Sequence, residues 1–146
     1  MLKEFCKFIV ERTASGSAFT LGTTLQVGYR PQDAPDRCNV VIESVGGSVY
    51  FDLPDRADQV FQVISRSTRG KLANIFDARD DAWEIFNALT GNVSGIIKSA
   101  GWTLPVVDKA YIAMVIEAVA TPAYIGTDEQ GRFEYSTNYI VKIRDA

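Results

Sequence analysis

The stretch from residue 133 to residue 144 constrains the fold most, because apolar and polar side chains alternate along it almost without exception. Aromatic, β-branched or threonine side chains occupy every second position from Phe133 to Ile143, and the positions between them are polar apart from Ile140. Successive side chains of a strand point to opposite faces of a sheet. The pattern therefore predicts a strand with one buried face and one face in water, as in antiparallel sheets.

Shorter β patterns occur upstream of this stretch. Residues 59–65 carry apolar side chains on both faces, which favours a central place in the sheet. Residues 50–54 form a short extended piece. We expect further strands at residues 24–29, 38–43, 102–107 and 110–120.

Two segments have helical periodicity. Residues 2–13 place apolar side chains at helical spacing opposite lysine and glutamate, and residues 72–89 carry the clearer stripe. The acidic residues of the second segment lie mostly in its N-terminal half, where they suit the helix dipole, and Gly91 is placed to end the helix. The apolar stripe consists of Leu72, Ile75, Ala78, Ala82, Ile85, Phe86 and Leu89.

Together these patterns predict an α+β fold, a mainly antiparallel or mixed sheet of about five strands packed against two principal helices. The chain has 146 residues without an internal repeat or linker, so we expect a single domain spanning residues 1–146. Residues 92–101 could form a short helix or a loop. We expect loops at residues 14–22, 30–37, 45–48, 67–71 and 121–131.

The charge balance limits the partners of the chain. A net charge of −3 argues against sequence-independent binding to nucleic acid, which needs a basic face. Cys6 and Cys38 are expected to be reduced core thiols. The sequence has no secretory signal pattern and no apolar run of about 18 residues, so we expect a cytoplasmic protein without a membrane partner.

The sequence lacks the residues of most catalytic and cofactor sites. It contains no histidine, which removes Ser–His and Cys–His pairs and histidine-ligated zinc. Neither a phosphate-binding loop nor a dinucleotide-binding glycine pattern is present. We therefore expect no enzyme activity, no cofactor and no metal site.

Four acidic residues lie close together in the second predicted helix. They could offer hard oxygen ligands to a divalent metal, or they could form a solvated face whose charge Arg79 partly offsets. We prefer the solvated face, because hard-metal cages usually draw their ligands from loops or several elements. The four residues are Asp77, Asp80, Asp81 and Glu84.

Charges of both signs are interleaved in the proline-containing segments 30–37 and 52–58. Paired carboxylates could perform acid–base chemistry, but a solvated or subunit-contacting surface is the simpler interpretation. A basic stretch of Arg66, Arg69 and Lys71 could touch phosphate, although we expect a loop before the helix there. We predict partner contacts at Arg30, Asp33, Asp36, Arg37, Asp52, Asp55, Arg56, Asp128 and Arg132.

Residues 125–139 have the sequence Ile-Gly-Thr-Asp-Glu-Gln-Gly-Arg-Phe-Glu-Tyr-Ser-Thr-Asn-Tyr, a combination that is hard to obtain by chance. With residues 30–43, 50–54 and 78–86, this stretch resembles the tailed-phage minor capsid or tail-terminator family. The resemblance runs over most of the chain.

The resemblance implies a structural virion protein without enzymatic activity. Members of such a family close into a ring, expected to hold six subunits, at the head-proximal end of a long tail. The ring ends polymerisation of the tail tube and offers a head connector or stopper protein a docking surface, while DNA passes through the lumen without specific binding. The resemblance thus implies assembly in the host cytoplasm and a final location at the head–tail junction.

Two alternatives stay open on the sequence alone. The chain could be another head–tail connector or a tail-tube component. It could also be a small acidic metal-dependent hydrolase or ligand-binding module that uses the acidic group of residues 77–84. Closing a ring needs two different patches that meet across each contact, and a sheet edge can supply one of them.

Overall fold

The computed structural model describes residues 2–13, 19–44, 56–70, 72–90, 102–106 and 109–145. These residues form two α-helices, a short 3-10 helix and seven strands, and the predicted α+β class is confirmed. The elements are α1 (Leu2–Arg12), β1 (Leu25–Val27), β2 (Cys38–Glu43), β3 (Arg56–Arg69), η2 (Leu72–Asn74), α2 (Ile75–Thr90), β4 (Trp102–Val106), β5 (Lys109–Ala118), β6 (Ala123–Thr127) and β7 (Arg132–Asp145).

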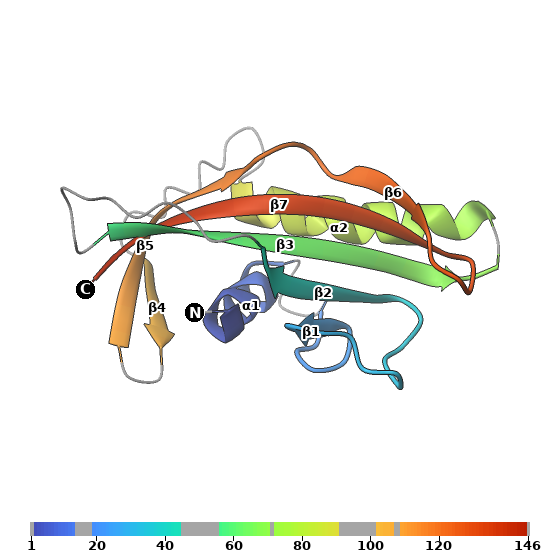
Figure 1. Ribbon diagram of the computed structural model, residues 1–146, viewed down its shortest axis with the longest axis horizontal. Helices are drawn as coiled ribbons and strands as arrows, with labels where there is room; N and C mark the ends of the chain where they lie inside the picture. The colour runs from blue at the N-terminus through green and yellow to red at the C-terminus, as the bar shows by residue number, and fades with distance from the viewer. Residues whose placement is uncertain are drawn as a thin grey trace.

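The strands form one mixed sheet around the long, curved β3 and β7 (Figure 1). Six strands follow the order β1-β2-β3-β7-β5-β4, and only the contact of β1 with β2 is parallel. The second edge of β7 is shared, because β5 pairs with its C-terminal part and β6 with its N-terminal part. The described residues thus contain seven strands where the sequence predicted about five.

The predicted C-terminal strand is confirmed as β7, which spans 14 residues. Tyr139, Val141 and Ile143 are buried on one face, while Asn138 and Arg144 on the other face are exposed. The central position predicted for residues 59–65 is also confirmed, since β3 lies between β2 and β7. Alternation therefore identified β7 and its buried face, and apolar residues on both faces identified the central place of β3.

Two predicted loops are wrong because pairing continues into them. β3 extends to Arg69 across a register shift after Arg66. Within this irregularity the Ser67 Oγ accepts a hydrogen bond of 2.9 Å from the main-chain N–H of Phe133, which keeps the two strands joined. The predicted loop over 67–71 is therefore strand as far as residue 69.

The predicted connection over 121–131 contains β6, which the sequence pattern did not reveal. Tyr124 of β6 lies opposite Tyr135 of β7, and their ring centroids are 5.8 Å apart. Cross-strand aromatic pairs stabilise a sheet, so this contact compensates for a strand that is mostly exposed. The tight turn predicted before residue 132 is confirmed: Gly131 has a φ of 73° and donates to the Asp128 carbonyl at 3.1 Å.

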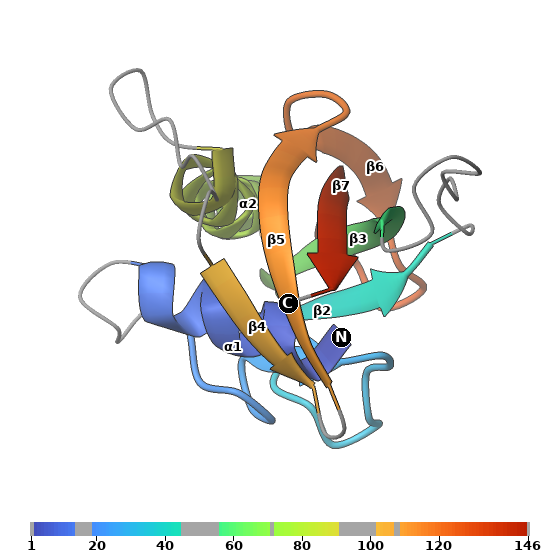
Figure 2. The ribbon, with the colours of Figure 1, turned by 90° about the vertical axis from the view of Figure 1, so that its left-hand side faces the viewer.

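Both helices lie on the same side of the sheet (Figure 2). α2 packs along β3 and β7, and α1 contacts α2 and the strands β1, β2 and β4. At the centre, Phe5 of α1 stacks on Phe61 of β3 with ring centroids 4.5 Å apart, and Tyr139 of β7 lies 6.4 Å from Phe5. All three side chains are fully buried, and burial of one such side chain contributes about 1.5–3 kcal/mol.

The helix predicted over 72–89 begins with the 3-10 turn η2, and Leu72 is 77% exposed. Leu72 therefore does not belong to the buried stripe, because the tighter turn η2 precedes the α-helix at this point. The predicted strand over 24–29 is shorter, at Leu25–Val27. Residues 45–48, 50–54 and 92–101, and most of 14–22, lie outside the described residues.

The two cysteines are buried as free thiols, as predicted. Burial, with a smaller effect of Glu4, raises the pKa of the Cys6 thiol to about 12. A thiol in this state is a poor nucleophile, because the thiolate is the reactive form. Among the described residues, no helix is long and apolar enough to cross a membrane.

Candidate functional site

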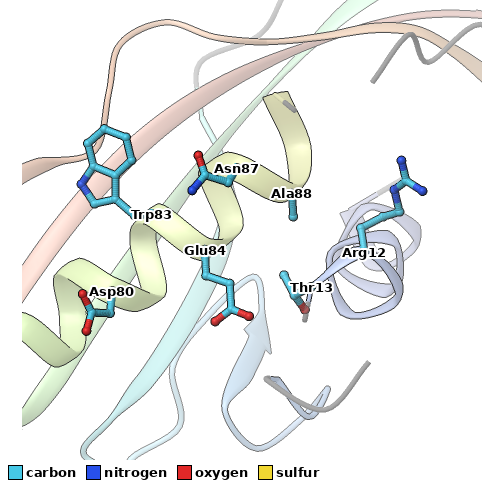
Figure 3. A pocket seen from close by; sticks show the side chains of 7 residues that line it. All are labelled: Arg12, Thr13, Asp80, Trp83, Glu84, Asn87 and Ala88. Atoms are coloured by element: carbon cyan, nitrogen blue, oxygen red, sulfur yellow. The ribbon is translucent and has the colours of Figure 1, made fainter. Parts of the chain in front are cut away.

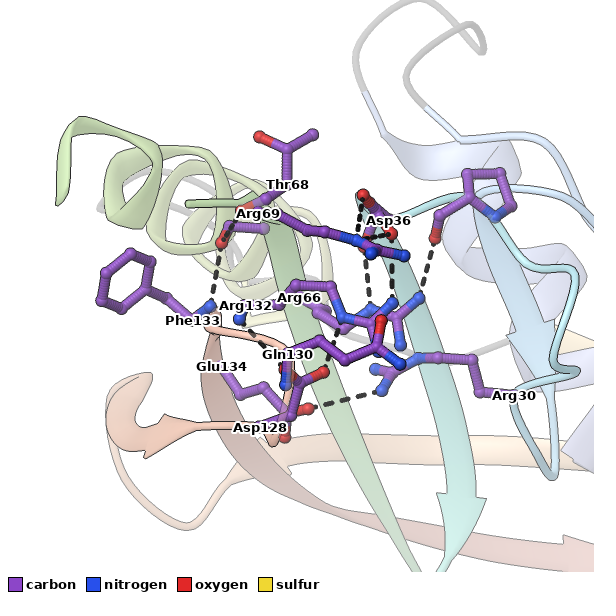
Figure 4. A network of polar contacts seen from close by, with 12 residues as sticks. Arg30, Asp36, Arg66, Thr68, Arg69, Asp128, Gln130, Arg132, Phe133 and Glu134 are labelled. Carbon is purple, nitrogen blue, oxygen red and sulfur yellow. Dashed lines mark hydrogen bonds and ion pairs between the residues drawn. The ribbon is translucent and has the colours of Figure 1, made fainter. Parts of the chain in front are cut away.

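Several of the predicted contact residues meet where β3 ends and β7 begins (Figure 4). Antiparallel pairing sets Arg66 against Glu134 and Arg69 against Arg132, while the 30–37 loop and the β6–β7 turn approach from either side. We call this group the sheet-end network. It consists of Arg30, Asp36, Arg66, Arg69, Asp128, Arg132 and Glu134.

Asp36 joins two strands of the sheet to the 30–37 loop. Its carboxylate accepts hydrogen bonds from Arg69 Nε at 3.1 Å and from Arg132 Nη1 at 3.1 Å. Desolvation acts to raise the pKa of the Asp36 carboxyl, but the hydrogen bonds from Arg132 and Arg69 outweigh it and hold the pKa below its ordinary value. Asp36 is therefore fully ionised near neutral pH.

Asp128 organises the β6–β7 turn. Its Oδ1 accepts the main-chain N–H groups of Gln130 at 2.9 Å and Arg132 at 3.0 Å, and its Oδ2 accepts Arg132 Nε at 2.6 Å. Partial burial acts to raise the pKa of the Asp128 carboxyl, but the hydrogen bonds from Arg132 and Gln130 lower it overall. Desolvation acts to lower the pKa of the Arg132 guanidinium, but its hydrogen bonds to Asp128 and Asp36 raise the pKa overall. The Arg132 guanidinium is thus fixed between two carboxylates.

The other two arginines at the centre of the network have weaker partners. Arg66 is 5% exposed and donates to the main-chain carbonyls of Asp36 at 2.8 Å and Pro35 at 2.9 Å. The Nη1 of Arg30 lies 3.5 Å from Glu134 Oε1. The Nε and Nη2 of Arg30 are buried and have no hydrogen-bond acceptor within the described residues.

A cavity of about 300 Å³ opens beside this network. All four arginines contribute to its wall, together with the 30–37 loop and the β6–β7 turn. The lining residues are Arg30, Pro31, Gln32, Ala34, Asp36, Arg66, Arg69, Gln130 and Arg132.

Arg37 is predicted as a partner contact as well, but its guanidinium turns toward α2. It binds Asp81 through two hydrogen bonds, Nε to Oδ2 at 3.1 Å and Nη2 to Oδ1 at 2.8 Å, and its Nη1 lies 3.4 Å from Asp77. The hydrogen bond to Asp81 is the main cause that raises the pKa of Arg37. This bidentate pair anchors the 30–37 loop to α2.

The remaining predicted contact residues lie elsewhere. Asp33 is exposed on the 30–37 loop. Asp52 and Asp55 lie outside the described residues, and Arg56 begins β3 opposite Arg144, at the other end of the sheet from the network. The structure therefore brings Arg30, Asp36, Asp128 and Arg132 together and does not bring Arg37 or Arg56 to them.

The acidic residues of α2 do not converge. Asp80 and Glu84 line a cavity of about 540 Å³ between α2 and the end of α1, and Figure 3 shows their carboxylates separated along the helix. Asp77 and Asp81 are engaged by Arg37. Within the part of the chain that the structure describes, no three histidine, cysteine, aspartate or glutamate side chains are grouped to hold a metal ion.

An apolar surface lies between β6 and the start of α2. Leu72 and Phe76 line a cavity of about 540 Å³ together with Tyr135, and Tyr124 extends the patch by packing against Tyr135. Leu72, Phe76 and Tyr124 are all at least 48% exposed. We call β6 together with Leu72, Phe76 and Tyr135 the β6 surface.

The family comparison decides between the interpretations left open by the sequence. Residues 17–145 match the model of a family described as bacteriophage tail terminator protein. The chain belongs to the bacteriophage tail terminator family. No curated protein matches the chain.

Membership of the tail terminator family confirms the resemblance found in the sequence, and it gives the chain a structural role in completing a phage tail. The matched segment begins after α1 and contains the whole sheet-end network and the β6 surface. Family membership thus makes the chain a structural protein of the virion.

Sequence reasoning missed three members of the network. The sequence pattern marks Arg66 and Arg69 as basic residues of a predicted loop, and it puts Glu134 on the solvent-facing side of its strand. Their meeting depends on the β3–β7 register, which pairs residues more than sixty positions apart. No short-range pattern in the sequence carries that information.

Proposed function

We propose that this chain forms a closed ring, expected to hold six subunits, at the head-proximal end of a long phage tail. In this role it ends polymerisation of the tail tube and gives a head connector or stopper protein a surface to dock on. The observation that carries the proposal is the tail terminator family match over residues 17–145. In this proposal the chain has no enzymatic activity, and its final location is the head–tail junction.

The β6 edge supports a contact between subunits. Within the described residues β6 pairs with β7 alone, so its second edge can accept a strand or loop of a neighbour. Exposed edges usually carry charged residues that prevent pairing, whereas β6 has the sequence Ala-Tyr-Ile-Gly-Thr. Its Ile125 is 52% exposed. We propose β6 as one half of the heterologous contact that closes a ring.

The sheet-end network supports a second contact. Asp36, Asp128 and Arg132 are held in fixed positions by mutual hydrogen bonds, so they can meet a partner with little loss of side-chain entropy. Arg30 lies beside them, 3.5 Å from Glu134. We propose these residues and the exposed Asp33 as partner contacts. For Asp52, Asp55 and Arg56 the proposal rests on the sequence alone.

The charge balance supports free passage of DNA. A subunit with net charge −3 repels a phosphate backbone rather than binding it. A ring of such subunits can therefore surround DNA without specific binding.

Electron microscopy of phage particles that lack this protein tests the proposed role. We expect overlong tails, or filled heads without joined tails, and we expect the wild-type gene supplied from a plasmid to restore joined particles. Tails of normal length already joined to heads would overturn the proposal. Heads without any tail tube would favour the alternative of a tube component.

A substitution on the edge strand tests the subunit contact. Ile125→Lys places a charge on β6 and should reduce the number of joined particles at least tenfold in the same complementation assay, while the melting temperature of the purified chain changes little. Tyr29→Lys is a matched control, because Tyr29 is 71% exposed and lies next to β1 rather than β6. Equal complementation by the two variants would exclude β6 as a subunit contact.

A further inference from the structure

The cavity beside the sheet-end network has an unusual wall for a protein of net charge −3. Four arginines line it, and they come from three separate parts of the chain: the loop after β1, the end of β3 and the start of β7. The four are Arg30, Arg66, Arg69 and Arg132. Guanidinium groups gathered in this way repel one another unless anions separate them.

The carboxylates of the network balance this charge incompletely. Asp36 lies between Arg69 and Arg132, Asp128 binds Arg132, and Glu134 faces Arg30. Four guanidinium groups thus meet three carboxylates, which leaves one positive charge in excess.

The excess falls on Arg30 and Arg66. Arg66 is neutralised by no carboxylate in direct contact within the described residues, since its hydrogen bonds go to two main-chain carbonyls. Burial first, and the positive charge of Arg30 second, hold the pKa of the Arg66 guanidinium below its ordinary value. A lowered arginine pKa indicates that the surroundings oppose the positive charge.

Arg30 also has hydrogen-bonding capacity that the fold does not use. Its Nε and Nη2 are buried without an acceptor in the described part of the chain, and its ion pair to Glu134 is long at 3.5 Å. A buried donor without a partner is unfavourable. Nε and Nη2 together form one side of the guanidinium group, the side that binds a carboxylate through two parallel hydrogen bonds.

We propose that this cavity is a binding socket for one carboxylate group, supplied by an acidic side chain of a neighbouring protein subunit. One carboxylate in the cavity would cancel the single excess charge of its four lining arginines. The inference rests on the proposed function, because it takes the partner from the assembled tail. A DNA phosphodiester also carries one charge, but the net negative charge of the chain disfavours contact with DNA.

Thermal unfolding of the purified chain with small anions as probes tests the socket directly. Sodium acetate should raise the melting temperature above that in sodium chloride of equal ionic strength, by roughly 3–5 °C at ten times its dissociation constant. Arg30→Gln should abolish the acetate-specific rise. Arg144→Gln, an exposed arginine at the other end of β7, is the matched control and should keep it.

Three results with added anions would overturn the proposal. The first is an acetate effect no larger than that of chloride, and the second is an acetate effect that survives in Arg30→Gln. The third is stabilisation by dimethyl phosphate but not by acetate, which would assign the cavity to a DNA phosphate instead. In chloride alone, Arg30→Gln should melt at the same or a higher temperature than wild type, because one of four mutually repelling cations is removed. A lower value would show that Arg30 serves the fold, against the proposal.

Particle assembly separates failure of the socket from failure of the proposed function. Arg30→Gln, supplied to phage that lack the protein, should restore at least tenfold fewer joined particles than wild type or Arg144→Gln. If Arg30→Gln restores joining as well as wild type and Arg144→Gln do, the tail terminator role stands and the socket proposal is wrong. If loss of the protein leaves joined tails of normal length, the role itself is wrong, and the acetate measurement still reports on the cavity.

Discussion

The aromatic centre of the core and the sheet-end network lie along the same two strands, β3 and β7. They differ in how completely the fold balances their polar and charged side chains. At the centre, Phe61 and Tyr139 are fully enclosed by α1 and α2. At the sheet end, beyond the cover of α1, the strands carry arginines and acids that bind one another. Both regions keep buried polar atoms without a hydrogen-bond partner in the described residues, the Tyr139 hydroxyl at the centre and two nitrogens of Arg30 at the sheet end. Only the sheet end also carries an excess of charge, four arginines against three carboxylates.

This difference indicates where stability and function reside. The aromatic side chains at the centre are fully buried, so no partner reaches them and they act on stability alone. Partly buried charge that the fold leaves unbalanced costs stability, and such local violations occur in natural proteins mainly at functional sites. Three substitutions and one change of pH test this division, and they are taken in order of decreasing effect on stability.

The largest effect is expected in the core. Phe61→Ala removes the ring that stacks on Phe5 at 4.5 Å and should lower the free energy of unfolding by about 3–5 kcal/mol, measured by urea unfolding. Phe76→Ala makes the same substitution at a phenylalanine that is 57% exposed and serves as the control. It should change the free energy of unfolding by less than about 1 kcal/mol. Similar losses for both variants would contradict the assigned core.

A smaller effect is expected at the turn of the network. Asp128→Ala removes three hydrogen bonds, two from main-chain N–H groups and one from Arg132. We expect a loss of about 1–2 kcal/mol in the free energy of unfolding. Glu129→Ala changes the exposed neighbour and should stay within about 0.5 kcal/mol of wild type. A neutral Asp128→Ala would mean that the turn holds without its aspartate.

The pH dependence of stability distinguishes the network from the core. Asp36 and Asp128 have lowered pKa values in the folded chain, against about 3.9 when unfolded. Their stabilisation is therefore complete above the unfolded pKa and is lost as the pH falls through the folded pKa. Melting temperatures between pH 6 and pH 2.5 should fall steeply below about pH 4, and less steeply in Asp128→Asn.

Two controls sharpen the acid measurement. Phe76→Ala should keep the wild-type acid slope, since it removes no carboxylate. Asp33→Asn removes an exposed carboxylate of the 30–37 loop and should flatten the slope less than Asp128→Asn does. An acid slope identical in wild type and Asp128→Asn would argue against the contribution of this carboxylate.

The smallest effect on stability is expected for Glu134→Gln. The contact of Glu134 with Arg30 spans 3.5 Å, so its loss should change the free energy of unfolding by less than about 1 kcal/mol. The substitution nevertheless raises the excess positive charge of the network from one to two, so acetate should stabilise this variant more than wild type. Glu117→Gln, which alters an exposed ion pair with Lys142, is the control. A weaker acetate effect in Glu134→Gln would contradict the charge balance described for the cavity.

Much of the fold follows from local pattern. The alternation ending at Ile143 predicts β7 and its buried face, because strand side chains alternate whatever the strand pairs with. The apolar spacing of residues 72–89 predicts α2 in the same way, although its first residue, Leu72, lies in η2. The missed strand β6 has no such pattern, since three of its five residues are exposed and apolar or small, and only its pairing with β7 makes it a strand.

The candidate site follows from the sequence only in part. Residues 30–37 and 128–132 stand out as charged segments near turns, and this was enough to select Arg30, Asp36, Asp128 and Arg132. The same reasoning selected Arg37, whose guanidinium binds Asp81 of α2 while its side chain stays 45% exposed. A charged loop residue is the same in sequence whether it faces a helix or a neighbouring subunit, because that choice depends on where the helix packs.

The sequence by itself determined the fold class, the helices, the long strands and the family, since each rests on residue type and short spacing. The tertiary structure decided which charges meet. The antiparallel register of β3 and β7 sets Arg66 against Glu134, and the 30–37 loop adds Arg30 and Asp36 from a distant part of the chain. Electrostatic energy depends on the distance between charges in space, and that distance exists only once the strands are paired.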